Sequence, residues 1–91
     1  MIIAQGAARL TGPMETREDI RYLEWVASSL GVDVAERDAS WLWAGVSALL
    51  VVAGWEDSSA ARCDVTVADH AGLTLHYLAD HRMSLTHPQS A

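Results

Sequence analysis

The stretch from Thr16 to Gly31 constrains the fold most, because both its ends and its apolar spacing match an α-helix. The Thr16 hydroxyl can accept from the amide of Asp19, whose carboxylate can reach back to the Thr16 amide, and this arrangement is a capping box. Gly31 supplies a residue that turns left-handed beyond the helix. The pattern predicts a helix over residues 17–30. Its apolar face would consist of Ile20, Leu23, Val26, Ala27 and Leu30.

Two aromatic residues fall on the other side of this predicted helix. At about 100° per residue, Trp25 lies near the centre of the polar face, beside Glu18, Tyr22 and Ser29. Tryptophan and tyrosine are enriched where protein interfaces carry most of their binding energy. We therefore expect Glu18, Tyr22 and Trp25 to belong to a protein interface, unless another part of the same domain covers them.

Residues 41–53 form the longest apolar run in the chain. Asp38 or Ser40 can cap a helix at its start, and apolar side chains would surround that helix, which would therefore be buried. An alternative makes residues 49–53 a central strand, because a short apolar run fits either structure. We favour the helix, which Gly54 would end.

Alternation of apolar and polar residues predicts an antiparallel β-hairpin in the last third of the chain. The turn would lie at residues 69–72, with Gly72 in the left-handed conformation that a short bulged loop needs. The inward face of the hairpin would consist of Cys63, Val65, Val67, Leu73, Leu75 and Tyr77.

Ninety-one residues suffice for one domain with one core, so residues 1–91 are expected to form a single domain. Residues 1–13 would be an N-terminal arm or edge strand, and residues 83–91 a flexible tail. The expected fold class is α+β, with two helices packed on a C-terminal antiparallel β-hairpin or small sheet. The expected core consists of Ile20, Leu23, Val26, Leu30, Leu49, Leu50, Val65, Val67, Leu75 and Tyr77.

The charge balance restricts the partners of the chain. Six basic residues against twelve acidic ones give a net charge of −6, which repels a phosphate backbone, so we expect no direct nucleic-acid binding. An acidic surface suits solubility and docking onto a basic protein. The hydrophobic fraction of 51% is high for so small a chain, so some apolar residues should lie on the surface and mark a contact with a partner or a second copy.

Cysteine usage and the apolar segments indicate a cytoplasmic protein. Cys63 is the only cysteine, so neither an intramolecular disulfide nor a thiolate zinc site can form. Residues 1–5 lack the basic start of a signal peptide. The apolar run at residues 41–53 is too short to span a bilayer, so we expect no membrane association.

No catalytic or cofactor motif occurs in the sequence, so we expect no enzymatic activity, no catalytic residues and no cofactor. Potential metal ligands are concentrated only in the last third of the chain, and their spacing does not bring three of them to one point. No metal site is therefore expected from these residues, which are His70, His76, Asp80, His81 and His87.

These features favour a non-enzymatic protein-binding module, most simply a small acidic inhibitor or adaptor that covers a partner surface. Anti-defence proteins, antitoxins and immunity proteins are of this type, which is an analogy of class, since no stretch is specific to one family. The alternative is a self-associating structural or small-ligand-binding domain. A metal-dependent factor that uses the C-terminal histidines is a third alternative.

Overall fold

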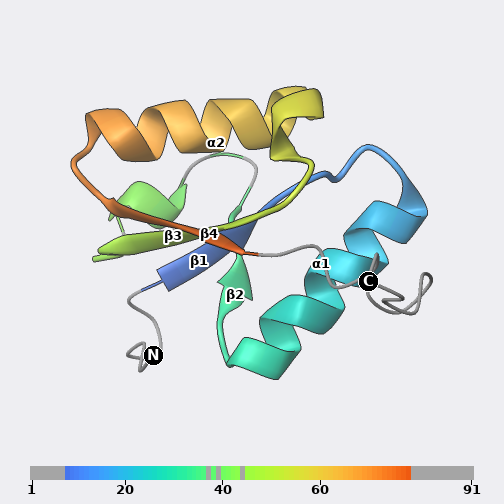
Figure 1. The fold of residues 1–91 in the computed structure, drawn as a ribbon. Helices are drawn as coiled ribbons and strands as arrows, with labels where there is room; N and C mark the ends of the chain where they lie inside the picture. Colours follow the sequence, from blue (N-terminus) through green and yellow to red (C-terminus); the bar gives the residue numbers. More distant parts are fainter. Residues whose placement is uncertain (1–7, 37, 39, 44, 79–91) are drawn as a thin grey trace, which may run out of the picture.

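A four-stranded parallel sheet with helices on both faces organises the chain in the computed structural model (Figure 1). The structure describes residues 8–36, 38, 40–43 and 45–78. The elements are β1 (Ala8–Thr11), α1 (Arg17–Leu30), β2 (Asp33–Val34), the 3-10 turn η1 (Ser40–Trp43), β3 (Ala48–Val52), the 3-10 turn η2 (Trp55–Asp57), α2 (Ser59–His70) and β4 (Thr74–Leu78). In the sheet the strands follow the order β2-β1-β3-β4.

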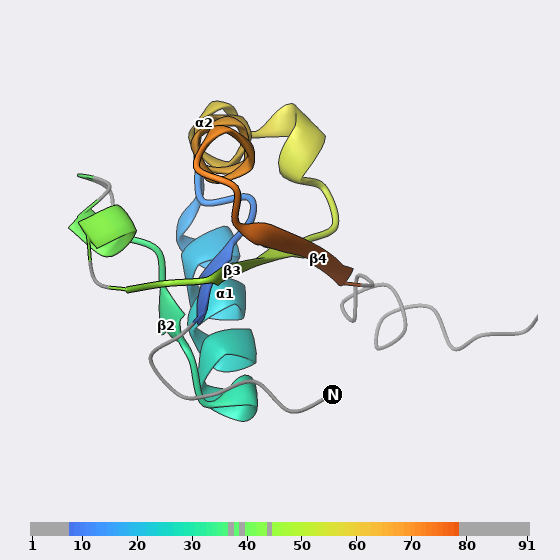
Figure 2. The ribbon, with the colours of Figure 1, turned by 90° about the vertical axis from the view of Figure 1, so that its left-hand side faces the viewer.

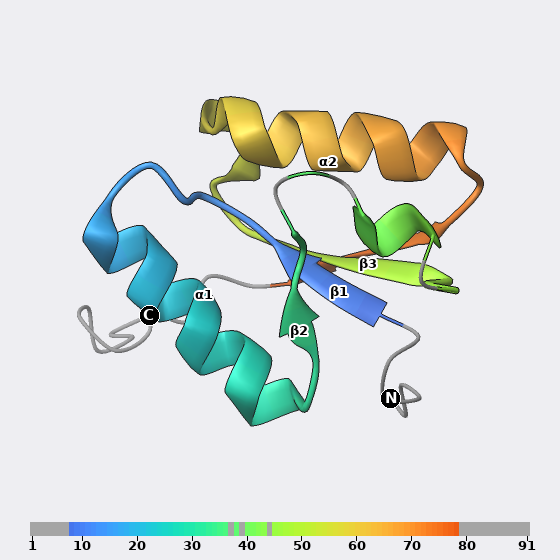
Figure 3. The same cartoon turned by 180° about the vertical axis from the view of Figure 1, so that it is seen from behind.

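The chain winds in opposite directions from the middle of this sheet. β1 leads through α1 to β2 on one side, and β3 leads through α2 to β4 on the other. Crossovers between parallel strands are right-handed, so opposite directions require the two helices to cover opposite faces. Figures 2 and 3 show this arrangement. The winding therefore reverses between β1 and β3, whose carboxyl ends lie side by side.

β3 occupies the centre of the sheet with both faces covered. Leu50 and Val52 pack with α1, whereas Leu49 and Val51 pack on the side of α2. All five residues of β3 are buried, as is typical of parallel strands. The favoured helix over this run is therefore wrong, and the alternative central strand is confirmed. Hydrogen bonds to β1 and β4 satisfy the backbone amide and carbonyl groups of β3. The spacing of apolar residues within the run itself does not reveal these partner strands.

The expected antiparallel hairpin is also wrong, because its first half is the helix α2. Ser58 caps this helix by accepting at Oγ from the amide of Ala61, 3.1 Å away. Ala61, Val65 and Ala68 recur at helical spacing and are buried against the sheet. Gly72 does have a positive φ of 80°, but it ends α2 and leads into β4. The fold is thus built on a parallel sheet, and it has no hairpin among the described residues.

The predicted helix at residues 17–30 is confirmed with both ends. The amide of Asp19 donates to Thr16 Oγ1 over 3.0 Å, the amide of Thr16 donates to Asp19 Oδ2 over 3.3 Å, and Gly31 has a φ of 72°. Its buried face is rotated from the expected one, because α1 packs on β1 and β2 mainly through residues 22, 23, 26 and 27. Tyr22 is thus buried, while Ile20 and Leu30 are 40% and 48% exposed.

The other residues expected in the core are buried in part. The structure buries Leu23, Val26, Leu49, Leu50 and Val65 and half-buries Val67 and Leu75, whereas Tyr77 is 57% exposed. β1 is an inner strand between β2 and β3, which corrects the expected edge strand. The expected arm and tail lie largely outside the described residues, which begin at residue 8 and end at residue 78.

Two leucines of α1 offer a matched test of this packing. Leu23 is 2% exposed and Leu30 is 48% exposed. Leu23→Ala should lower the free energy of unfolding by about 2 to 5 kcal/mol, because it leaves a cavity beside Gly12 and Val52. Leu30→Ala should lower it by less than about 1 kcal/mol. Urea denaturation of both variants measures the difference, and equal losses would contradict the observed orientation of α1.

Candidate functional site

The candidate site lies at the carboxyl ends of β1 and β3. In open sheets of this type, ligands bind in the crevice outside the strand ends where the winding direction reverses. Here two loops leave that point in opposite directions, residues 12–16 toward α1 and residues 53–58 toward α2. A ligand site is therefore expected at these two loops and at the starts of the helices that follow them.

A close approach of the two loops fixes the geometry of this region. A Cβ atom on Gly12 would lie 2.7 Å from Val52 Cβ and 2.9 Å from a methyl of Leu23, so only glycine fits there. On the facing loop, Gly54 has a φ of 94°, and a Cβ on it would lie 3.2 Å from Pro13 Cγ. The loop after β1 is thus held directly against β3 and its loop.

Two hydrogen bonds between side chains join β1 and the loop after it to α2 and its cap. The hydroxyl of Thr11, at the end of β1, donates to Asp64 Oδ2 over 2.6 Å. The hydroxyl of Ser58, which caps α2, donates to Glu15 Oε2 over 2.7 Å. Two carboxylates are therefore held at the switch point, which is the place between β1 and β3 where the winding reverses. The hydroxyls that hold them belong to buried residues and have little freedom to move.

The carboxylate of Glu15 is hydrogen-bonded to Ser58, the N-cap of α2, and negative charge is favourable near a helix N-terminus. Its Oε1 also accepts from the amide of Met14 over 3.1 Å. The hydrogen bond from Ser58 lowers the pKa of Glu15 below its ordinary value, because it stabilises the charged form. Glu15 is consequently ionised at neutral pH, and a negative charge of the chain itself already lies at the start of α2.

Asp64 lines a small pocket beside these loops. The pocket has a volume of about 110 Å³. Its other walls are Met14, Ala35, Ala60 and Cys63. A neighbouring pocket of about 140 Å³ shares Met14 and Ala35 and continues along α1 to Glu24. A polar group among apolar walls is the lining that small-molecule sites share, but both pockets are smaller than the roughly 300 to 1,000 Å³ usual for drug-sized ligands.

A larger hollow of about 430 Å³ lies at the carboxyl ends of β3 and β4. The rings of Trp55 and Tyr77 meet there with centroids 5.8 Å apart, and Glu56 lies on its rim. It is broad and open, and both Glu56 and Tyr77 are exposed. We place the candidate site at Asp64 instead, because that pocket adjoins the switch point and contains a side chain fixed by a buried donor.

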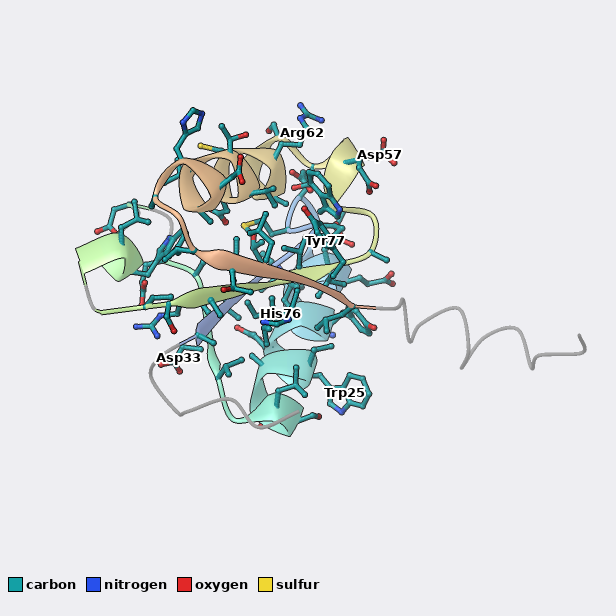
Figure 4. All side chains as sticks on the ribbon, turned by 60° about the vertical axis from the view of Figure 1, so that its left-hand side comes forward. Trp25, Asp33, Asp57, Arg62, His76 and Tyr77 are labelled. Carbon is teal, nitrogen blue, oxygen red and sulfur yellow. The ribbon has the colours of Figure 1, made fainter. Side chains whose placement is uncertain are left out.

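The residues expected to form a protein interface lie along α1 but do not share one environment. Trp25 is 53% exposed and projects from the helix, as Figure 4 shows. Glu18 is also exposed, whereas Tyr22 is only 9% exposed. The rings of Tyr22 and Trp25 still contact each other, with centroids 6.0 Å apart. Trp25, Leu30 and Leu78 line a groove of about 180 Å³.

The C-terminal histidines are only partly described. His70 lies at the exposed end of α2 and His76 lies in β4, while Asp80, His81 and His87 are outside the described residues. Within the described part of the chain, no group of three or more potential ligands could hold a metal ion. Cys63 is exposed on α2, which corrects the inward position expected from the hairpin.

Comparisons of the chain with protein-family models, with curated proteins and with solved structures found no match. Among the described residues, no helix has the length and apolar character that crossing a membrane requires. The chemistry of the site therefore rests on the residues and contacts described above.

The carboxylates of the site were not singled out from the sequence. Glu15 and Asp64 are far apart in the chain, and in the expected hairpin Asp64 would point outward, because its neighbours Cys63 and Val65 would point inward. One local signal was present: Ser58 precedes Ala61, Val65 and Ala68, which is a cap followed by helical spacing. Reading that segment as a helix would have predicted a second βα unit and with it the loop after β3.

The contact between Ser58 and Glu15 predicts how stability depends on pH. The folded-state pKa of Glu15 is lowered, so its contribution is present above the unfolded pKa, about 4.3, and is lost as the pH falls through the folded value. Glu15→Gln should flatten the fall in stability over that range. Ser58→Ala should do the same and also cost about 0.5 to 2 kcal/mol at pH 7 through the lost cap.

Urea denaturation at a series of pH values from neutral to acidic measures both effects. Glu18→Gln is the matched control, because Glu18 is an exposed glutamate three residues further along the chain, in the first turn of α1. A pH profile of Glu15→Gln identical to that of the unmodified protein would show that Ser58 does not stabilise the Glu15 carboxylate.

Proposed function

We propose that the domain binds a small molecule with hydroxyl or amino donors in the pocket at Asp64. The observation that supports this most is the hydrogen bond from the fully buried Thr11 hydroxyl to Asp64 Oδ2. It fixes a carboxylate in a pocket beside the point where sheets of this topology bind ligands. This corresponds to the small-ligand form of the alternative expected from the sequence.

A fixed carboxylate is suited to recognising donors. Each oxygen of a carboxylate can accept more than one hydrogen bond, so the bond from the Thr11 hydroxyl does not by itself saturate Asp64. A side chain held in place before binding loses little freedom when a ligand arrives, which raises affinity. The apolar walls, including Met14 and Ala60, shield such hydrogen bonds from water. The donors of the ligand would therefore decide its orientation.

The charges at the site favour an uncharged or cationic ligand over a phosphate. No basic side chain is among the described residues that line the two adjoining pockets. The N-terminus of α2, where a phosphate would bind, already has the Glu15 carboxylate on Ser58. The net charge of −6 acts in the same direction. The expected absence of nucleic-acid binding, of a cofactor and of enzymatic activity, and the expected cytoplasmic location, stay predictions.

The pocket volumes limit the size of the ligand. A water molecule occupies about 30 Å³ of liquid, so 110 Å³ corresponds to about four waters. Met14 lines both this pocket and the neighbouring one, and methionine is flexible enough to adjust to a ligand that enters both. A small amine is therefore of the appropriate size for the pocket at Asp64, whereas a single sugar ring would have to enter both pockets.

Thermal-shift screening followed by titration calorimetry tests this proposal. The probes are free monosaccharides, unphosphorylated nucleosides, small amines and their phosphorylated counterparts. Asp64→Asn should reduce the affinity for the best probe by about tenfold or more, and Thr11→Val should reduce it by releasing Asp64. Asp57→Asn is the control, since it removes the same charge from an exposed residue that lines neither pocket. Equal affinity of Asp64→Asn and Asp57→Asn, or preference for the phosphorylated probes, would contradict the proposal.

A second candidate function is the protein-binding module, an inhibitor or adaptor. It is favoured by the exposure of Trp25 beside the half-exposed Leu30, since large exposed aromatic residues are typical anchors of interfaces. The acidic balance suits a basic partner. The buried Tyr22 ring would contact the Trp25 ring on its protein side, while Glu18 would lie at the rim of the interface.

Trp25→Ala tests the protein-binding candidate. Binding should weaken by about 2 kcal/mol or more, as for a central anchor, while the unfolding midpoint stays nearly unchanged because Trp25 is half exposed. Pull-down of partners from the native host by the tagged protein, followed by titration of the purified partner, measures the binding. Thr66→Ala, on the exposed side of α2, is the control. A partner bound equally by both variants would remove Trp25 from the interface.

A further inference from the structure

The two edges of the sheet differ in how well they are protected from pairing. β2 has only two residues, and Asp33 in it is exposed. Short edges with charged side chains resist pairing with other strands. β4 has five residues, Thr-Leu-His-Tyr-Leu, with no proline, glycine, lysine or carboxylate. Among the described strands, none pairs with the outer edge of β4.

The backbone of β4 shows which of its groups are available at that edge. The amide of Thr74 donates to the carbonyl of Ser47, 3.0 Å away, so Thr74 directs its polar groups toward β3. Because these groups alternate along a strand, His76 also faces β3. Leu75 and Tyr77 therefore direct their amide and carbonyl groups outward.

We propose that β4 pairs antiparallel with β4 of a second copy, about a two-fold axis at His76. In this register Leu75 lies opposite the partner's Tyr77, and each such pair exchanges both of its N–H···O bonds. His76 then faces the partner's His76 in the closer type of pair, which has no hydrogen bonds of its own. The register uses the outward groups of both Leu75 and Tyr77, and the resulting contact is closed and symmetric.

The side chains of β4 suit this pairing. Leu75 and Tyr77 lie on the α2 face of the sheet, and His76 lies on the opposite face, as Figure 4 shows for Tyr77 and His76. Tyr77 is 57% exposed, with Trp55 against one side of its ring. The partner's Leu75 would cover part of the remaining ring surface, and aromatic and aliphatic neighbours across strands stabilise a sheet.

Sedimentation equilibrium of the full chain tests the proposal, with a reversible dimer expected. Tyr77→Pro should weaken dimerisation by about tenfold or more, since it removes an outward amide from each copy. The Tyr77 amide does not pair with β3, and proline is tolerated on edge strands, so the variant should stay folded. Trp25→Ala should leave the dimer intact, which separates this contact from the interface proposed on α1.

A second variant keeps the test decisive if proline impairs folding. His76→Glu places two carboxylates opposite each other at the axis and should also weaken the dimer. Thr66→Glu adds the same charge on the exposed side of α2 and should not. Hydrogen exchange provides an independent readout, because the amides of Leu75 and Tyr77 should be protected in the dimer and lose protection on dilution.

Three results would overturn the proposal. The first is a monomer at every concentration up to the solubility limit. The second is a monomer whose Leu75 and Tyr77 amides are protected, which would mean that the chain covers its own edge. The third is a dimer that neither Tyr77→Pro nor His76→Glu weakens.

Discussion

Burial of β3 on both faces is the constraint on which the rest of the structure depends. A strand with five buried residues needs a covering layer on each side, and the described part of the chain supplies one α-helix for each. Right-handed crossovers then require the two helices to be reached in opposite directions. The reversal between β1 and β3 follows from these two conditions, as does the meeting of the loops at residues 12–16 and 53–58.

The properties of the candidate site follow from the contact between these two loops. Gly12 allows the first loop to lie against Val52, which brings Glu15 within reach of Ser58. A carboxylate of the domain itself is thereby hydrogen-bonded to the N-cap of α2, and Asp64, six residues after Ser58 on the same helix, accepts from the Thr11 hydroxyl. A site of this composition accepts hydrogen bonds and repels anions, so it differs from the phosphate cradles that sheets of this topology often carry.

Local signals allowed some elements to be predicted from the sequence and misled on others. The capping box at Thr16 and the glycine at position 31 gave α1 correctly, because both act within a few residues. The alternation of Cys63, Val65 and Val67 suggested a strand, although the same residues fit a helix whose buried stripe is Ala61, Val65 and Ala68. None of the site was predicted, since Glu15 meets Ser58, and Thr11 meets Asp64, only through the packing of α2 on the sheet.

The sequence by itself determined α1, the left-handed glycines at its end and after α2, and the acidic character of the chain. These properties depend on single residues or on short-range hydrogen bonds. Only the tertiary structure decided that residues 48–52 form a strand, that Tyr22 is buried while Ile20 is exposed, and that Asp64 receives the Thr11 hydroxyl. The physical reason is that burial of an apolar run lowers the free energy about equally whether the run is a helix or a strand. Which of the two forms depends on the hydrogen-bond partners that the rest of the chain offers to its backbone.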